Sequence, residues 1–124
     1  MAQSIPGHVE TFVTGADLST YKNRWMKVSA DNTVSLATAV TDSIIGVLDD
    51  TPYAAAGAQA AVRMSGTAEI VAGAAISAGA KVTTDSAGRA VTATSGQAYF
   101  GIAIQAATAL ADLIEVNIMV QGTV

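Results

Sequence analysis

Residues able to carry out catalysis are few in this sequence. Histidine, a common general base, occurs once in the 124-residue chain, at His8, and cysteine does not occur. A Ser–His–Asp or Cys–His arrangement needs a base that is held by the fold, whereas His8 lies near the N-terminus. Asp49-Asp50 is the only adjacent pair of carboxylates, and no EF-hand spacing surrounds it. The glycines form no nucleotide-binding pattern. The sequence therefore predicts a protein that is not an enzyme and has no cofactor or metal site.

The positive charges suggest a possible binding surface. Lys22, Arg24 and Lys27 put half of the six positive charges into six residues, beside Tyr21 and Trp25. These residues would form a docking patch for an acidic surface, or they would be the solvated face of a strand, and the sequence leaves both interpretations open. The net charge of −4 argues against a nucleic-acid partner, which requires clustered Lys and Arg.

Length and composition indicate a single small domain. The chain is 51% hydrophobic but only 5% aromatic and 13% charged, so small side chains must build most of its core. No apolar stretch approaches the roughly 20 residues of a membrane span. The N-terminus has no basic region followed by an apolar run, which a secretory signal would need. We therefore expect no membrane partner and synthesis in the cytoplasm.

The elements that must position these residues have the patterns of β-strands. Short β-prone runs at Trp25–Val28 and Thr33–Leu36 flank an Asp-Asn turn, and a second such pair, Lys81–Thr84 and Arg89–Thr92, flanks Asp85–Gly88. Apolar and polar residues alternate from residue 114 to residue 121, which is the period of a strand.

Two further segments are relevant to the fold. Ala61–Met64 and Glu69–Val71 flank a turn at Ser65-Gly66. The alanine run Ala54–Ala61 favours a helix, but Gly57 weakens it, so we expect at most one helical turn there. Many short strands with frequent turn signals predict an all-β fold, a small β-barrel or β-tulip-like domain.

An internal echo divides the chain. Lys27–Asp31 reads K-V-S-A-D and Lys81–Asp85 reads K-V-T-T-D, and further matches follow in the same order as far as Val62–Thr67 and Ile118–Thr123. Glycine and alanine produce chance matches, but the fixed order of the blocks favours an internal pseudo-repeat. We predict a single β domain, residues 16–124, built from two units of about 17–67 and 75–123.

The first fifteen residues fall outside this repeat. Ile5, Val9 and Phe12 are apolar residues that a disordered tail would rarely carry. The segment could add an edge strand, lie on a partner or fray. We predict that residues 1–15 form an extended N-terminal arm, stiffened by Pro6, which grips a partner.

Blocks spread along most of the chain resemble a known family. These blocks are Ala16–Ser19, Val28–Asn32, Ile45–Leu48, Ala75–Val82 and Phe100–Ala103. They are similar to the small capsid decoration, or cement, proteins of tailed bacteriophages, over about residues 16–120. The resemblance implies a β-barrel-like domain on the outside of an icosahedral head. It also implies a homotrimer whose partner is the major capsid protein, a virion location and no catalytic residues.

The sequence also suggests contact residues and alternative functions. The predicted capsid or partner contacts are Ile5, Pro6, His8, Val9, Phe12, Lys22 and Arg24. An alternative function is another virion surface module, such as a head fibre base or a glycan-binding β domain, although glycan sites usually carry exposed aromatic residues. An enzyme subunit is a third class, which the lone histidine disfavours.

Overall fold

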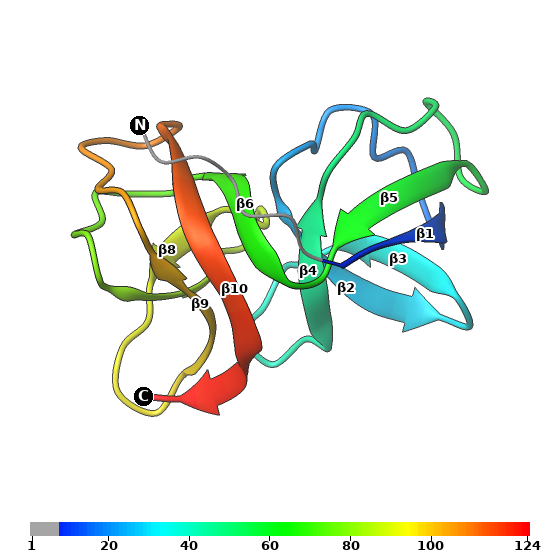
Figure 1. The fold of residues 1–124 in the computed structure, drawn as a ribbon. Helices are drawn as coiled ribbons and strands as arrows, with labels where there is room; N and C mark the ends of the chain where they lie inside the picture. Colours follow the sequence, from blue (N-terminus) through cyan, green and yellow to red (C-terminus); the bar gives the residue numbers. More distant parts are fainter. Residues whose placement is uncertain (1–7) are drawn as a thin grey trace.

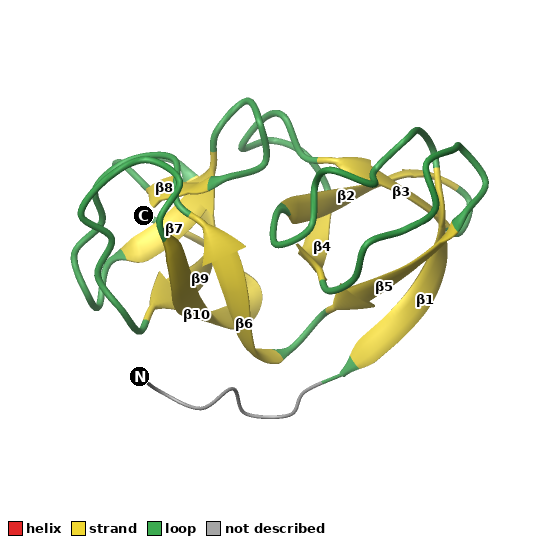
Figure 2. Ribbon diagram, turned by 90° about the horizontal axis from the view of Figure 1, so that it is seen from above, coloured by secondary structure: helices red, strands yellow, loops and turns green. Residues whose placement is uncertain are grey.

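The protein consists of two five-stranded β-sheets that lie side by side (Figures 1 and 2). The computed structural model describes residues 8–124, apart from the side chains of Val120 and Gln121. These residues form ten strands and no helix. Accordingly, none of the described residues belongs to a helix capable of crossing a membrane. The prediction of an all-β fold that contains a small barrel is confirmed.

The first sheet is a closed barrel with the strand order β1-β3-β2-β4-β5. Its strands are β1 (Val9–Thr14), β2 (Trp25–Ala30), β3 (Thr33–Leu36), β4 (Ile44–Leu48) and β5 (Gln59–Arg63). All neighbours are antiparallel except β1 and β3, which run parallel. Closure leaves this barrel without a free sheet edge.

The second sheet has the order β6-β10-β9-β7-β8. Its strands are β6 (Gly66–Val71), β7 (Lys81–Thr84), β8 (Ala90–Thr92), β9 (Ala98–Ala103) and β10 (Leu113–Thr123). A single parallel bridge from Ala72, just after β6, to Ala90 in β8 brings the two ends of the sheet together. The second sheet is therefore nearly closed.

The two sheets share one topology. Placing β6 to β10 on β1 to β5 reproduces every neighbour, including the parallel step, which is Thr14 beside Val34 in one sheet and Ala72 beside Ala90 in the other. A repeated unit would produce this shared order. The pseudo-repeat of 17–67 and 75–123 stays a prediction, because strand order does not measure how well two halves superpose.

The two predicted hairpins form, and the turn residues explain why. Asn32 takes a positive φ of 52° between β2 and β3, a conformation that asparagine tolerates. In the β7–β8 turn the Asp85 carboxylate accepts hydrogen bonds from the backbone N–H groups of Ala87 and Arg89, at 2.8 and 2.9 Å. Local side-chain chemistry thus fixes both turns.

Two sequence expectations differ from the structure between β5 and β6. The segments around Ser65-Gly66 are strands, but they belong to different sheets, so the chain crosses here from one sheet to the other. The alanine run contains no helical turn: its first half forms bends and turns, and β5 begins at Gln59. Pairing with β1 and β4 outweighs the helical preference of alanine.

The predicted arm also differs, because Val9–Thr14 is a strand of the barrel. β1 pairs with β5 at five positions and with β3 at two, so it closes the gap between those strands. Its side chains alternate: Val9 and Val13 are exposed, whereas Thr14 is buried and Phe12 packs against the core. A domain boundary after residue 15 would therefore remove a strand that the barrel needs. Residues 1–7 lie outside the described residues.

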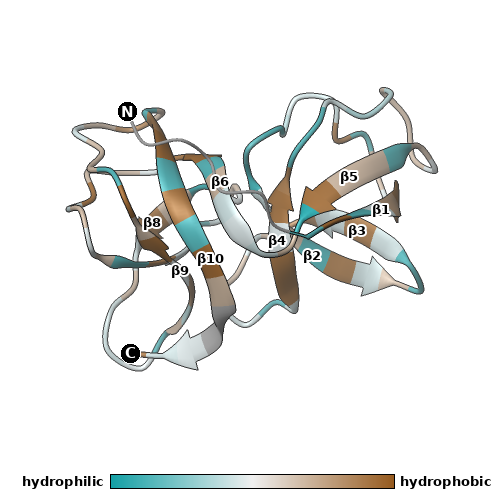
Figure 3. Ribbon diagram, viewed as in Figure 1, coloured by the Kyte–Doolittle hydropathy of each residue, from teal (hydrophilic) through white to brown (hydrophobic). Residues whose placement is uncertain are grey.

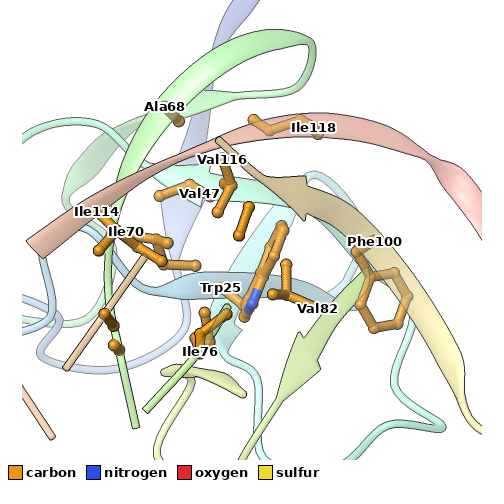
Figure 4. Close-up of a cluster of buried hydrophobic side chains, with 14 of the residues drawn as sticks. Trp25, Val47, Ala68, Ile70, Ile76, Val82, Phe100, Ile114, Val116 and Ile118 are labelled. Atoms are coloured by element: carbon orange, nitrogen blue, oxygen red, sulfur yellow. The ribbon is translucent and has the colours of Figure 1, made fainter. Parts of the chain in front are cut away.

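Trp25 joins the two sheets. It belongs to β2 of the first sheet, but its fully buried side chain lies in the larger core cluster, which comes mainly from the second sheet (Figure 4). The indole ring lies 5.8 Å from the Phe100 ring, and its Nε1 donates to the Thr83 carbonyl at 3.1 Å. The first barrel keeps a smaller core of its own around Met26 and Leu48.

Backbone contacts surround this tryptophan. Trp25 N donates to the Gly88 carbonyl at 2.7 Å, and Val71 N donates to the Asn23 carbonyl at 2.9 Å. Gly88 has a φ of 72°, and a Cβ at this position would lie 2.5 Å from Leu36 Cδ1. Only glycine therefore allows the β7–β8 turn to approach the first barrel so closely.

Trp25→Ala should lower the free energy of unfolding by about 3–5 kcal/mol, because it leaves a cavity between the sheets. Urea unfolding followed by circular dichroism measures this loss. Tyr53→Ala is the matched control, since Tyr53 is 81% exposed, and should change stability by about 0.5 kcal/mol or less. Equal effects of the two variants would contradict the role assigned to Trp25.

Deletion of residues 2–15 should destabilise the first barrel, because it removes β1 and unpairs β5. Deletion of residues 2–7 retains all ten strands and serves as the control. Thermal unfolding, with hydrogen exchange of the β5 amides, measures the difference. A long deletion with unchanged melting temperature and protected β5 amides would show that β1 is dispensable.

Candidate functional site

The described residues show surfaces and no enclosed site. No pocket is found, and residues 8–124 contain no group of three or more His, Cys, Asp or Glu side chains that could hold a metal ion. The candidate functional sites are therefore exposed faces of the two sheets and their loops.

Of the predicted contacts on the N-terminal segment, His8 and Val9 are accessible. His8 Nε2 lies 3.1 Å from Glu10 Oε1, and both side chains are exposed. The His8 backbone is fixed, because its N–H donates to Ser65 Oγ at 2.9 Å and its carbonyl accepts from Met64 N at 2.7 Å. Phe12 packs against the core of the first barrel, so it serves the fold. Ile5 and Pro6 lie outside the described residues.

The three clustered basic residues do not share one role. Lys22 is exposed. Arg24 lies between the sheets: its Nη1 donates to the Ala87 carbonyl at 2.9 Å, and its guanidinium carbon lies 5.5 Å from the centre of the Tyr21 ring. Lys27 Nζ lies 3.5 Å from Asp42 Oδ2. Arg24 and Lys27 are therefore engaged within the molecule, and Lys22 is the accessible cation of the three.

Two aspartates organise loops that sequence reasoning missed. Asp42 Oδ2 accepts from the N–H groups of Thr38 and Ala39, at 2.8 and 3.0 Å, in the β3–β4 loop. Asp112 Oδ2 does the same with the two residues at 108 and 109 of the β9–β10 loop. Both loops have the sequence pattern T-A-x-x-D, and this shared pattern could have predicted the two aspartate-held loops. The backbone N–H groups of Thr38 and Thr108 are the largest cause that lowers the pKa of each carboxyl below its usual value.

The second sheet also has exposed apolar side chains that were not predicted from the sequence. Leu110, Leu113 and Ile104 are 57%, 47% and 40% exposed, and all lie in or beside β9 and β10 of the second sheet. Figure 3 shows the alternation of hydrophilic and hydrophobic residues along β10. This end of the second sheet is thus an accessible surface with a substantial apolar share.

Comparison with known proteins identifies the family. The family model described as phage cement protein matches residues 15–118. The chain belongs to the phage cement protein family. The resemblance noted from the sequence is confirmed, and membership makes the protein a structural component of a bacteriophage head, located in the virion capsid.

A solved structure shares the fold of this phage cement protein. It is the crystal structure of the head fibre gp8.5 N base in bacteriophage phi29, with a TM-score of 0.61 and 20% sequence identity. The similarity covers 90% of this chain and 93% of the head fibre chain. No curated protein matches the sequence. The head fibre base therefore shows that this two-sheet architecture occurs in another phage head protein.

Acid should lower the free energy of unfolding of the cement protein, because it protonates Asp42. A carboxyl whose pKa is lowered by folding contributes stability above its unfolded pKa, near 3.8, and loses that contribution as the pH falls through its folded value. Asp42→Asn should cost about 1–3 kcal/mol of unfolding free energy at pH 7, where the carboxylate accepts two backbone hydrogen bonds.

The measurement is urea unfolding of both proteins between pH 7 and pH 2. The two curves should converge at the acid end. Asp31→Asn is the control, because Asp31 is exposed in the β2–β3 turn. A difference between Asp42→Asn and the parent that is the same at pH 2 and pH 7 would show that the ionised carboxylate is not responsible.

Proposed function

We propose that the protein binds the outer surface of the icosahedral phage head, contacts the major capsid protein there and stabilises the lattice. The family match over residues 15–118 carries this proposal. The fold is suited to it, because two sheets joined through a buried tryptophan form one rigid body. A rigid body that touches neighbouring capsid subunits resists their separation without any chemical step.

Repeated attachment increases the strength of weak contacts. A protein that occupies many equivalent sites on a head contributes a small binding energy at each site, and linked sites gain from high effective concentration. The net charge of −4 keeps free copies apart and soluble before assembly. Modest contacts per copy are therefore sufficient for a stabilising function.

Of the contacts predicted from the sequence, the proposal keeps those whose side chains are exposed. His8 and Val9 lie exposed at the start of β1, and Lys22 is exposed before β2, so these three are available to a capsid subunit. Arg24 and Phe12 are engaged in the fold. The proposed gripping element is therefore the exposed start of a folded barrel strand, together with the preceding residues of the chain.

We also propose that the protein is a homotrimer on the head. This proposal comes from the resemblance to decoration proteins at threefold positions. The exposed Leu110 is available to line a contact between copies. Light scattering of the free protein gives its mass, and a map of the decorated head gives the arrangement; single copies at isolated sites would exclude a trimer.

The second candidate function is that of a head fibre base. The shared fold with the phi29 head fibre base favours it. A fibre base would anchor a longer appendage at the sites where fibres attach, whereas a cement protein would occupy lattice sites throughout the head. Copy number per head, determined by quantitative mass spectrometry of purified virions, separates the two functions.

Binding to undecorated heads tests the proposal. Heads assembled without this protein should bind it to saturation in co-sedimentation, and decorated heads should disrupt at a higher temperature than bare heads. Heat-unfolded protein is the control for nonspecific adsorption. Absence of saturable binding, or equal disruption temperatures at full occupancy, would contradict a cement function.

A further inference from the structure

The pairing of β6 and β10 brings two glutamates together on the outside of the second sheet. Glu115 lies directly opposite Glu69 in the antiparallel register. The residues on either side of each glutamate face the core, so both carboxylates belong to the outer face; these neighbours are Ala68, Ile70, Ile114 and Val116. Like charges directly opposite one another on a sheet destabilise it. We call Glu69 and Glu115 the acidic pair.

Glu115 is buried although it lies on the outer face. The residue is 3% exposed, and its buried Oε2 has no hydrogen-bond partner. The backbone around it is satisfied: Ile104 N and Gln105 N both donate to its carbonyl, at 2.9 and 3.4 Å, and its own N–H donates to Gln105 Oε1 at 3.1 Å. Two residues opposite one are the pattern of a β-bulge, a feature that redirects side chains beside functional sites.

The positive charges of the described residues are placed elsewhere. None of the ion pairs formed by residues 8–124 includes Glu69 or Glu115. Arg63 pairs with Asp49, Arg89 pairs with Asp85, and Lys81 lies over the Tyr99 ring. A buried carboxylate oxygen without a hydrogen bond is unfavourable, and the described fold supplies no cation that relieves it.

Apolar residues border the acidic pair. Leu113 lies two residues before Glu115 on the same face of β10, and Val71 is opposite Leu113. Ile104 lies beside Glu115 through the bulge. Leu113 and Ile104 are 47% and 40% exposed. The surface thus combines two carboxylates with an accessible apolar border, which suits a long side chain that has an apolar stem and a cationic end.

We propose that the acidic pair receives a lysine or arginine side chain of the major capsid protein, whose apolar neighbours pack on Leu113 and Ile104. This inference rests on the proposed function, and it adds a contact on the second sheet to the one proposed at the start of β1. The net charge of −4 favours a basic contact on the partner. A cation that pairs with the exposed Glu69 carboxylate lies close to Glu115 and relieves the repulsion between the two carboxylates.

Neutralising the acidic pair tests the inference. Glu69→Gln and Glu115→Gln keep the size of each side chain and remove its charge, and Asp31→Asn is the control that removes one exposed charge from the first barrel. Each variant is titrated onto undecorated heads at low and at physiological salt. Glu69→Gln removes the accessible partner of the proposed ion pair and should raise the Kd by about 30-fold or more. Glu115→Gln should weaken binding in the same direction, and Asp31→Asn should not.

The melting temperatures of the free variants distinguish binding from folding. Glu115→Gln should melt at the temperature of the parent or higher, because the variant removes repulsion and an unpaired buried charge. A lower melting temperature together with parental binding by Glu69→Gln would overturn the inference, since Glu115 would then serve the fold alone.

Other outcomes would overturn the inference or assign the acidic pair to a different partner. Parental affinity of both glutamine variants would overturn the inference while the proposed function stands, whereas failure of the parent protein to bind heads would overturn both. Loss of the trimer in the variants, with head binding by the remaining form unchanged, would assign the pair to a second copy of this chain. A rise in the parent's melting temperature with calcium, absent in Glu115→Gln, would assign it to a metal ion.

Discussion

The insertion of Trp25 into the core of the second sheet is the contact on which the rest of the structure depends. Each sheet has only five strands, and the first barrel alone has a small core. The buried indole fills the interior of the other sheet and donates to the Thr83 carbonyl. Gly88 suits the approach of the two backbones, since its φ of 72° favours glycine and a Cβ there would lie 2.5 Å from Leu36 Cδ1. One large side chain of the first sheet thus lies in the core of the second and joins the two sheets (Figure 4).

That rigidity connects the fold with the place of the protein in the phage head. The described residues show no pocket, and their exposed features are strand faces and loops held by backbone hydrogen bonds to aspartates. A protein that works by contact needs a fixed surface, because ordering on binding would reduce its affinity. The similarity to a head fibre base shows that the same two-sheet arrangement is compatible with sequences only 20% identical. The contact residues are therefore expected to vary while the arrangement is retained.

Local patterns in the sequence predicted local structure well. The turn residues at Asp31-Asn32 and Asp85–Gly88 identified both hairpins, and alternation identified β10, because these signals lie within a few residues of the structure they specify. The prediction of an extended arm was wrong over Val9–Thr14, which forms β1. The strands that pair with β1 are distant in sequence, and a short alternating run does not reveal its partners. The burial of Glu115 could not be predicted either, because it depends on the register with β6 and on a bulge in the adjoining segment of the chain.

A cryo-electron microscopy reconstruction of heads decorated with this protein tests the central claim most directly, at a resolution that separates strands. The account predicts both sheets as one rigid density on the outer surface of the capsid, at sites repeated over the lattice and in contact with more than one capsid subunit. Density inside the head, or confined to a few fibre attachment sites, would contradict a cement function for this protein.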